Sequence, residues 1–140
     1  MKNKRTVALI IVFTLCLIIF GFTKIIDQIN MKKTLSEDEI AKVEKNLAII
    51  SGTLTKSSSP YTQIEAHEKE AKEIINMGYP AVNYFIEKYK SGKLDTGNAW
   101  VIAWMCNEIL GDKNPIKIWQ LDNKNGWSSG EEWFEKYTGK

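Results

Sequence analysis

The chain has 140 residues, of which 44% are hydrophobic, and its formal net charge is +2. Residues 1–34 contain six basic residues and one acid, whereas residues 35–140 contain 13 basic and 16 acidic residues. The C-terminal part therefore has a net charge of −3. This argues against nucleic acid as a partner, because nucleic-acid binding needs a clustered basic face. The length suffices for one modest domain beside a targeting segment.

The N-terminal segment predicts a membrane anchor. Residues 6–23, TVALIIVFTLCLIIFGFT, are 18 residues without a charge. As a helix they are about 27 Å long, close to the roughly 30 Å thickness of a hydrocarbon core. Three basic residues precede them, which favours a cytoplasmic tail of residues 1–5. We therefore expect a single-pass, signal-anchored cell-membrane protein with lipid around residues 6–23, a juxtamembrane linker at 24–35 and an extracytoplasmic domain at 36–140.

Two other fates of this segment stay open. A cleaved secretory signal would leave a secreted domain, although the apolar run is long for a signal and lacks small residues at an A-x-A-like site. Lipidation at Cys16 is disfavoured because Leu15 stands where a small residue should precede the cysteine. Since Cys16 lies in the membrane segment, it is not expected to pair with Cys106, and no disulfide framework is predicted.

The first helix of the domain is predicted to begin at Ser36. Ser36 and Glu39 form the S-x-x-E pattern of a capping box. The apolar residues that follow recur at intervals of three and four: Ile40, Val43, Leu47, Ile50 and Leu54. We interpret this stripe as one face of a helical bundle. The alternative use of the stripe is self-association of a structural anchor protein.

Prolines and glycines divide the next part of the chain into two predicted helices. Pro60 suits the first turn of a helix that Ser59 caps and Gly78 ends. Pro80 opens the following helix, which ends at Gly92. Both helices have one apolar face, formed by Tyr61, Ile64, Ala71, Ile74 and Ile75 in the first and by Ala81, Val82, Phe85, Ile86 and Tyr89 in the second.

The segment GNAWVIAWMCNEILGD, residues 97–112, predicts a helix buried in the middle of the domain. Its run of eight apolar residues, Ala99 to Cys106, is too short to cross a bilayer. Helices that are apolar on all sides lie inside bundles. We therefore expect Trp100 and Trp104, one turn apart, to be core residues, so that Trp100→Ala costs about 3–5 kcal/mol of stability.

The C-terminal tail is less regular. Asn125 and Gly126 form a turn dipeptide, and Ser128 or Ser129 can cap a short final helix. No other segment alternates with a period of two, so no sheet is predicted. The expected fold is all-α, with an N-terminal transmembrane helix followed by a bundle of about five helices.

Residues 71–112 resemble HEAT-type helical repeats. The resemblance rests on IINMGYPAVNYFIEKYKSG and GNAWVIAWMCNEILGD, where the matching residues are Gly78, Pro80, Ala81, Val82, Ala99, Ala103, Ile109, Leu110 and Gly111. Tryptophans stand where the family has smaller residues, and the chain has room for only about two repeats. The resemblance implies a compact HEAT-like bundle that binds a partner with its helical surface rather than performing chemistry.

The aromatic residues are the candidate binding residues, because they outnumber what a small core requires and exposed tryptophans mark interaction sites. We predict binding roles for Tyr84, Tyr89, Trp119, Trp127 and Trp133. The alternative for Trp127 and Trp133 is that they hold the tail against the bundle. The expected partner is a protein at the cell envelope. The sequence indicates neither the identity of this partner nor the oligomeric state of the chain.

Catalytic residues are sparse. His67, the only histidine, lies in HEKEA, which lacks the second histidine of a zinc-binding helix. Glu108 follows the apolar run, and Cys106 has no adjacent base. We therefore expect no catalytic site, metal or cofactor, and a membrane-tethered binding module. The alternatives are an envelope enzyme that uses His67 and Glu108, and the self-associating anchor protein.

Overall fold

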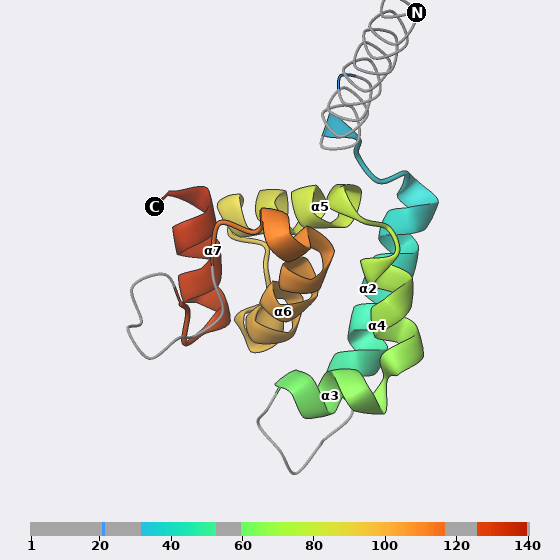
Figure 1. Ribbon diagram of the computed structural model, residues 1–140. Helices are drawn as coiled ribbons and strands as arrows, with labels where there is room; N and C mark the ends of the chain where they lie inside the picture. The colour runs from blue at the N-terminus through green and yellow to red at the C-terminus, as the bar shows by residue number, and fades with distance from the viewer. Residues whose placement is uncertain (1–20, 22–31, 53–59, 117–125, 140) are drawn as a thin grey trace, which may run out of the picture. The chain divides into compact units, whose positions relative to one another are not determined.

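The computed structural model describes residues 21, 32–52, 60–116 and 126–139 (Figure 1). The chain divides into two compact units, Met1–Lys33 and Thr34–Lys140, and the second unit contains almost all of the described residues. Across these residues the regular structure is helical, and no strand occurs. The prediction of an all-α fold is therefore confirmed for the described part of the chain.

Helix α2 (Glu37–Gly52) begins at the predicted capping box. The backbone N–H of Ser36 donates to the Glu39 carboxylate at 2.8 Å, and the N–H of Glu39 donates to the Ser36 hydroxyl at 3.3 Å. This exchange satisfies two backbone donors that a helix start leaves unpaired. Val43, Leu47 and Ile50 are buried, which agrees with their interpretation as one face of a bundle.

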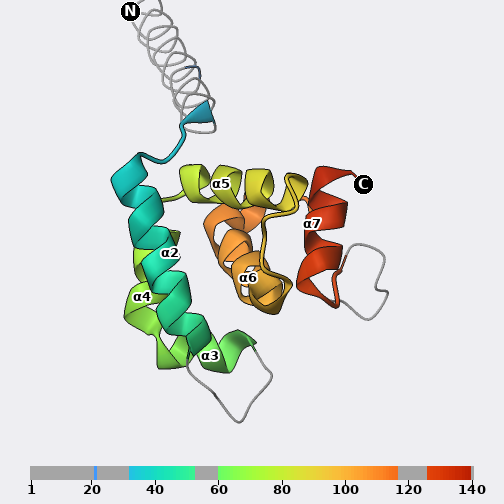
Figure 2. The same ribbon diagram turned by 180° about the vertical axis from the view of Figure 1, so that it is seen from behind.

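The predicted second helix is divided in two. Helix α3 (Pro60–Ala66) and helix α4 (Glu68–Ile75) meet at His67, whose φ of −129° and ψ of 43° are not helical. The six residues between Ile64 and Ala71 include no large apolar side chain, so the two apolar groups can face different neighbours. Figures 1 and 2 show the result: α4 runs beside α2, and α3 turns away from α4 near the C-terminal end of α2.

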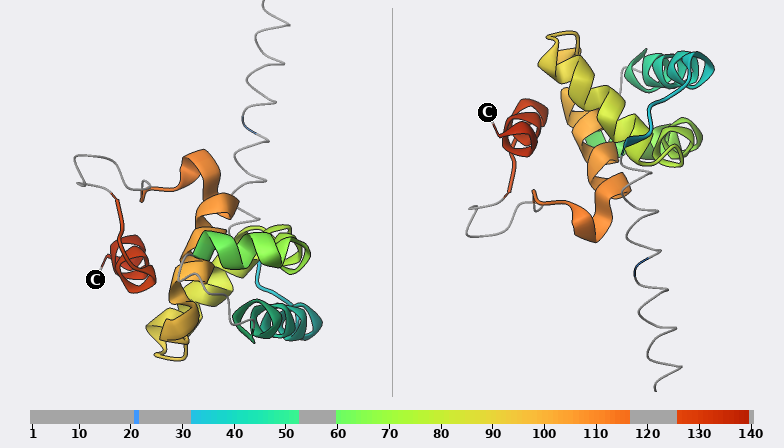
Figure 3. Two further views of the ribbon diagram at one scale, coloured as in Figure 1. Left: turned by 90° about the horizontal axis from the view of Figure 1, so that it is seen from below. Right: turned by 90° about the horizontal axis from the view of Figure 1, so that it is seen from above.

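Helix α5 (Tyr79–Lys90) follows Gly78, whose φ of 66° suits a residue without a side chain. A 3₁₀ turn, η1 (Thr96–Asn98), then leads into helix α6 (Ala99–Leu110), and a second such turn, η2 (Gly111–Lys113), follows it. Helix α6 lies in the middle of the unit and contacts α3, α4, α5 and α7 (Figure 3).

Helix α7 (Gly130–Thr138) is capped by Ser129, whose hydroxyl accepts the N–H of Glu132 at 3.1 Å. Its first residue touches the backbone of α6. A Cβ at Gly130 would lie 2.1 Å from the carbonyl carbon of Ala99, so only glycine allows this approach. Trp133 and Phe134 then enter the core, where both are fully buried.

In the described ranges, no helix is both long enough and apolar enough to cross a membrane. Apart from residue 21, the predicted anchor at residues 6–23 lies outside these ranges, as do the tail at 1–5, Leu54, Ser59 and Trp119.

Candidate functional site

One face of α6 carries Trp100, Trp104 and Glu108, which are spaced four residues apart and therefore share a stripe. Trp100 is 43% exposed, Trp104 is partly buried and Glu108 is exposed. The prediction that this helix is buried on every side is wrong for this stripe, and Trp100 is not a core residue. The neighbours of α6 cover its other faces, which are lined by Ala99, Val101, Ile102, Ala103, Met105, Cys106, Asn107 and Leu110.

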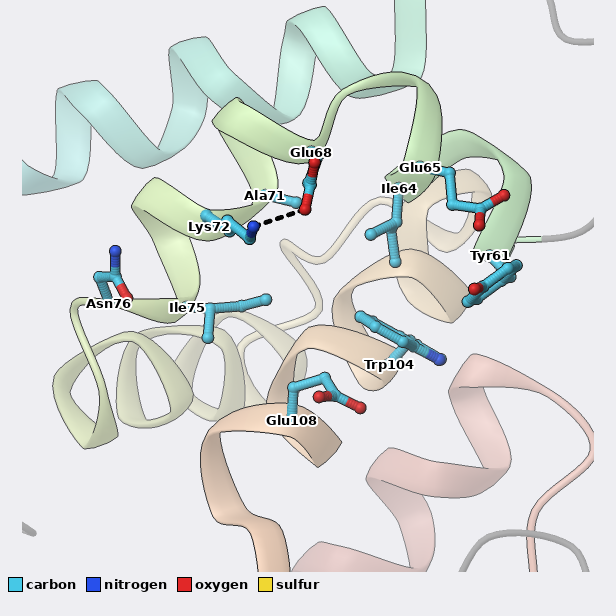
Figure 4. A pocket seen from close by; sticks show the side chains of 10 residues that line it. All are labelled: Tyr61, Ile64, Glu65, Glu68, Ala71, Lys72, Ile75, Asn76, Trp104 and Glu108. Carbon is cyan, nitrogen blue, oxygen red and sulfur yellow. Dashed lines mark ion pairs between the residues drawn. The ribbon is translucent and has the colours of Figure 1, made fainter.

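Two residues of the stripe, Trp104 and Glu108, form one wall of a groove between α3, α4 and α6 (Figure 4). The groove has a volume of about 630 Å³, within the roughly 300–1,000 Å³ of common ligand sites. We call it the Trp104 groove, and its lining residues are Tyr61, Ile64, Glu65, Glu68, Ala71, Lys72, Ile75, Asn76, Trp104 and Glu108.

Aromatic and aliphatic side chains form the apolar part of the Trp104 groove. The rings of Tyr61 and Trp104 meet edge to face, with centroids 6.2 Å apart and planes at 68°. Ile64 and Ala71 are buried beside them, and Ile75 is partly buried. Figure 4 shows Trp104 lying between Tyr61 and Glu108, with its indole open to the groove.

Carboxylates surround this apolar part. Glu65, Glu68 and Glu108 line the groove, and Lys72 is the one cation among the lining residues. Lys72 forms an ion pair with Glu68, and this contact lowers the pKa of the Glu68 carboxyl. The Tyr61 hydroxyl is hydrogen-bonded to the Glu65 carboxylate, which raises the pKa of Tyr61. The lining therefore contains three acidic residues and one basic residue, so its formal charge is negative.

The sequence pattern alone does not indicate this groove. Tyr61 and Trp104 lie on helices far apart in the chain, and the break at His67 that turns α3 toward α6 has no proline or glycine to mark it. One signal was present. Glu108 lies one turn after Trp104 on the stripe of the two tryptophans, and a carboxylate on a stripe indicates that the stripe reaches solvent.

Tyr84 and Tyr89, two of the predicted binding residues, lie outside the Trp104 groove. The Tyr84 hydroxyl donates to the Glu44 carboxylate at 2.6 Å, and Lys88 donates to the same oxygen at 2.7 Å. Burial and this hydrogen bond raise the pKa of Tyr84. Tyr89 stacks on Phe134 with ring centroids 5.0 Å apart. These tyrosines connect α5 to α2 and to α7.

Trp127 and Trp133, two further predicted binding residues, are buried. The Trp133 indole N–H donates to the Asn107 side-chain oxygen at 3.2 Å, and its ring stacks on Tyr137 with centroids 4.9 Å apart. Their positions agree with the alternative in which these residues hold the tail against the bundle. Trp119, the fifth candidate, is outside the described residues.

The candidate catalytic residues do not converge. Glu108 lines the Trp104 groove, whereas His67 is not among its lining residues. Cys106 is fully buried, and burial raises the pKa of its thiol, so the thiol is protonated at neutral pH. The described ranges contain no group of three or more His, Cys, Asp or Glu residues that could hold a metal ion.

Comparison of the chain with protein-family models, with curated proteins and with solved structures finds no match.

Proposed function

We propose that residues 36–140 form a helical binding module, tethered to the cell membrane by residues 6–23, that docks a protein partner in the Trp104 groove. The observation that carries this proposal is one stripe of the central helix, on which Trp100 is 43% exposed and Trp104 is only partly buried. Tryptophan is enriched among the residues that dominate protein interfaces, and its large rigid ring gains much from being covered.

The topology of the module is part of the proposal. The charge-free run at 6–23 and the basic residues before it support an N-terminus in the cytoplasm and a domain outside. Cleavage of this segment would release the same domain as a secreted protein. The resemblance of residues 71–112 to HEAT-type repeats implies the same mode of binding, since α4 and α6, which lie largely within these residues, present part of their surface in the groove.

The packing of α2 bears on the alternative of self-association. Val43, Leu47 and Ile50 are buried within the chain, so most of the described part of the stripe that self-association would need is already covered. The residues that line the Trp104 groove include no histidine and no cysteine. Their absence from this lining favours binding over catalysis. We therefore assign the module no enzymatic role.

Site-specific photo-crosslinking in native membranes tests this function. A crosslinking residue at position 65 faces the Trp104 groove, whereas one at position 87 lies on the exposed side of α5 and serves as the matched control. We expect a discrete protein adduct from position 65, lost in Trp104→Ala and absent from position 87. Adducts of equal yield from both positions, or adducts that persist in Trp104→Ala, would contradict a partner in this groove.

A further inference from the structure

The Trp104 groove also indicates the chemistry of what it binds, an inference that rests on the proposed function. Its lining combines an aromatic surface, made by Tyr61 and Trp104, with carboxylates on either side of it (Figure 4). Glu65 adjoins Tyr61 in α3, and Glu108 follows Trp104 by one turn in α6. An occupant that covers the rings therefore brings its own polar groups close to carboxylates.

Two of the three carboxylates lack a lysine or arginine partner among the lining residues. Lys72 is paired with Glu68, which leaves Glu65 and Glu108 as the carboxylates that an incoming cation can meet. The tyrosine hydroxyl on Glu65 is neutral, so it does not cancel that charge. The wider domain has the same sign, since residues 35–140 carry 13 basic and 16 acidic residues.

From this charge pattern we propose that the Trp104 groove binds a basic polypeptide segment in which lysine or arginine stands next to an apolar side chain. The apolar side chain covers Trp104 and Ile75, and the cations meet Glu65 and Glu108. Indole and phenol faces also attract ammonium and guanidinium groups directly. Buried apolar area holds the segment in place, while the charges select it and speed its association.

The same pattern disfavours a lipid surface as the occupant. Exposed tryptophans on a helix can enter a membrane interface, but membrane-surface helices set them beside lysine and arginine. Here the flanking groups are Glu65 and Glu108, which anionic headgroups repel. The charges that favour a basic segment thus act against an anionic membrane.

Titration of the full-length chain, held in non-ionic detergent, with fluorescent peptides tests this inference. The probe is a short peptide in which lysine alternates with leucine, and its matched partner has glutamate in place of each lysine. We expect the lysine peptide to bind and the glutamate peptide not to bind. Glu65→Gln/Glu108→Gln should weaken binding of the lysine peptide about two- to thirty-fold, the change expected for the loss of two exposed charge pairs.

Three variants and one buffer change make the result specific. Trp104→Ala should remove binding of the lysine peptide, whereas Glu87→Gln, an exposed change on α5 outside the groove, should leave it unaltered. Added salt should weaken binding to the wild type and have much less effect on the double glutamine variant. The glutamine side chains match glutamate in size at exposed positions, so this variant is expected to fold.

The outcomes separate the two proposals. Equal binding of both peptides that still requires Trp104 overturns the basic chemistry and leaves the binding function intact. Binding of the lysine peptide that neither Trp104→Ala nor the glutamine changes reduce overturns the use of this groove. Trp104-dependent association with anionic vesicles, or with a second copy of the chain, overturns the choice of a basic polypeptide as the occupant.

Discussion

The phenol ring of Tyr61 and the indole of Trp104 meet edge to face, 6.2 Å apart, across the boundary between α3 and α6. Neither ring belongs to the core: Tyr61 is 53% exposed, and Trp104 is only partly buried. The contact fixes two large aromatic surfaces beside a groove that carboxylates surround. A preformed aromatic surface binds a partner without the entropic cost of ordering it first.

A buried and an exposed tryptophan are predicted to differ in how much stability their truncation to alanine costs. Trp133 is fully buried, and Trp133→Ala should reduce the free energy of unfolding by about 3–5 kcal/mol. Trp100 is 43% exposed, so Trp100→Ala should cost half of that loss or less. Chemical denaturation of the full chain, followed by circular dichroism, measures both. Equal losses would show that Trp100 belongs to the core after all.

Gly130 is predicted to be irreplaceable for a steric reason. A methyl group there would lie 2.1 Å from the carbonyl carbon of Ala99, and backbone atoms cannot yield cheaply. Gly130→Ala should therefore separate the start of α7 from α6 and cost about 1–3 kcal/mol, the usual cost of overpacking. Gly52→Ala is the matched control, because nothing lies within 4 Å of its added Cβ. A melting temperature that falls equally in both variants would contradict this account.

Asn107 is predicted to stabilise the buried junction of α6 and α7. Its side-chain oxygen accepts the indole N–H of Trp133 and the side-chain amide of Asn114. Asn107→Ala leaves these buried donors unsatisfied, at about 1–3 kcal/mol each. A double-mutant cycle with Trp133→Phe, which removes one donor, measures the coupling. Strictly additive losses from the two substitutions would mean that the hydrogen bond contributes nothing.

Glu132 predicts a pH dependence of stability at the start of α7. Hydrogen bonds from Lys136 and Ser128 lower the pKa of its carboxyl from 4.5 to about 2 in the folded chain. A carboxyl with a lowered pKa stabilises the fold fully above its ordinary value and loses this contribution as the pH falls toward about 2. Unfolding measured over this range should depend less on pH in Glu132→Gln than in the wild type. Identical pH profiles would rule out this contribution.

Local sequence signals predicted the helix ends well because their physics is local. The capping box at Ser36, the helix start at Pro60 and the cap at Ser129 all depend on residues within one turn, and all occur in the structure. The all-α class follows from the same periodicities.

The site could not be predicted in this way, because burial of a helix face depends on what packs against it. The apolar run at 99–106 indicated a buried helix, and most of α6 is buried. The direction of α3 determines which stripe of α6 remains exposed. This direction follows from the break at His67, which no proline or glycine marks in the sequence. The candidate binding residues Tyr84, Tyr89 and Trp133 do not indicate the groove for the same reason, since their partners lie on other helices.

Tryptophan footprinting tests the central claim most directly. Oxidation is measured by mass spectrometry, once on the purified full chain and once on the chain in native membranes. The account predicts that Trp100 and Trp104 are oxidised in the purified chain and protected in native membranes, while Trp133 stays unreactive in both. Equal oxidation of Trp100 and Trp104 in the two preparations would contradict a protein partner on this face.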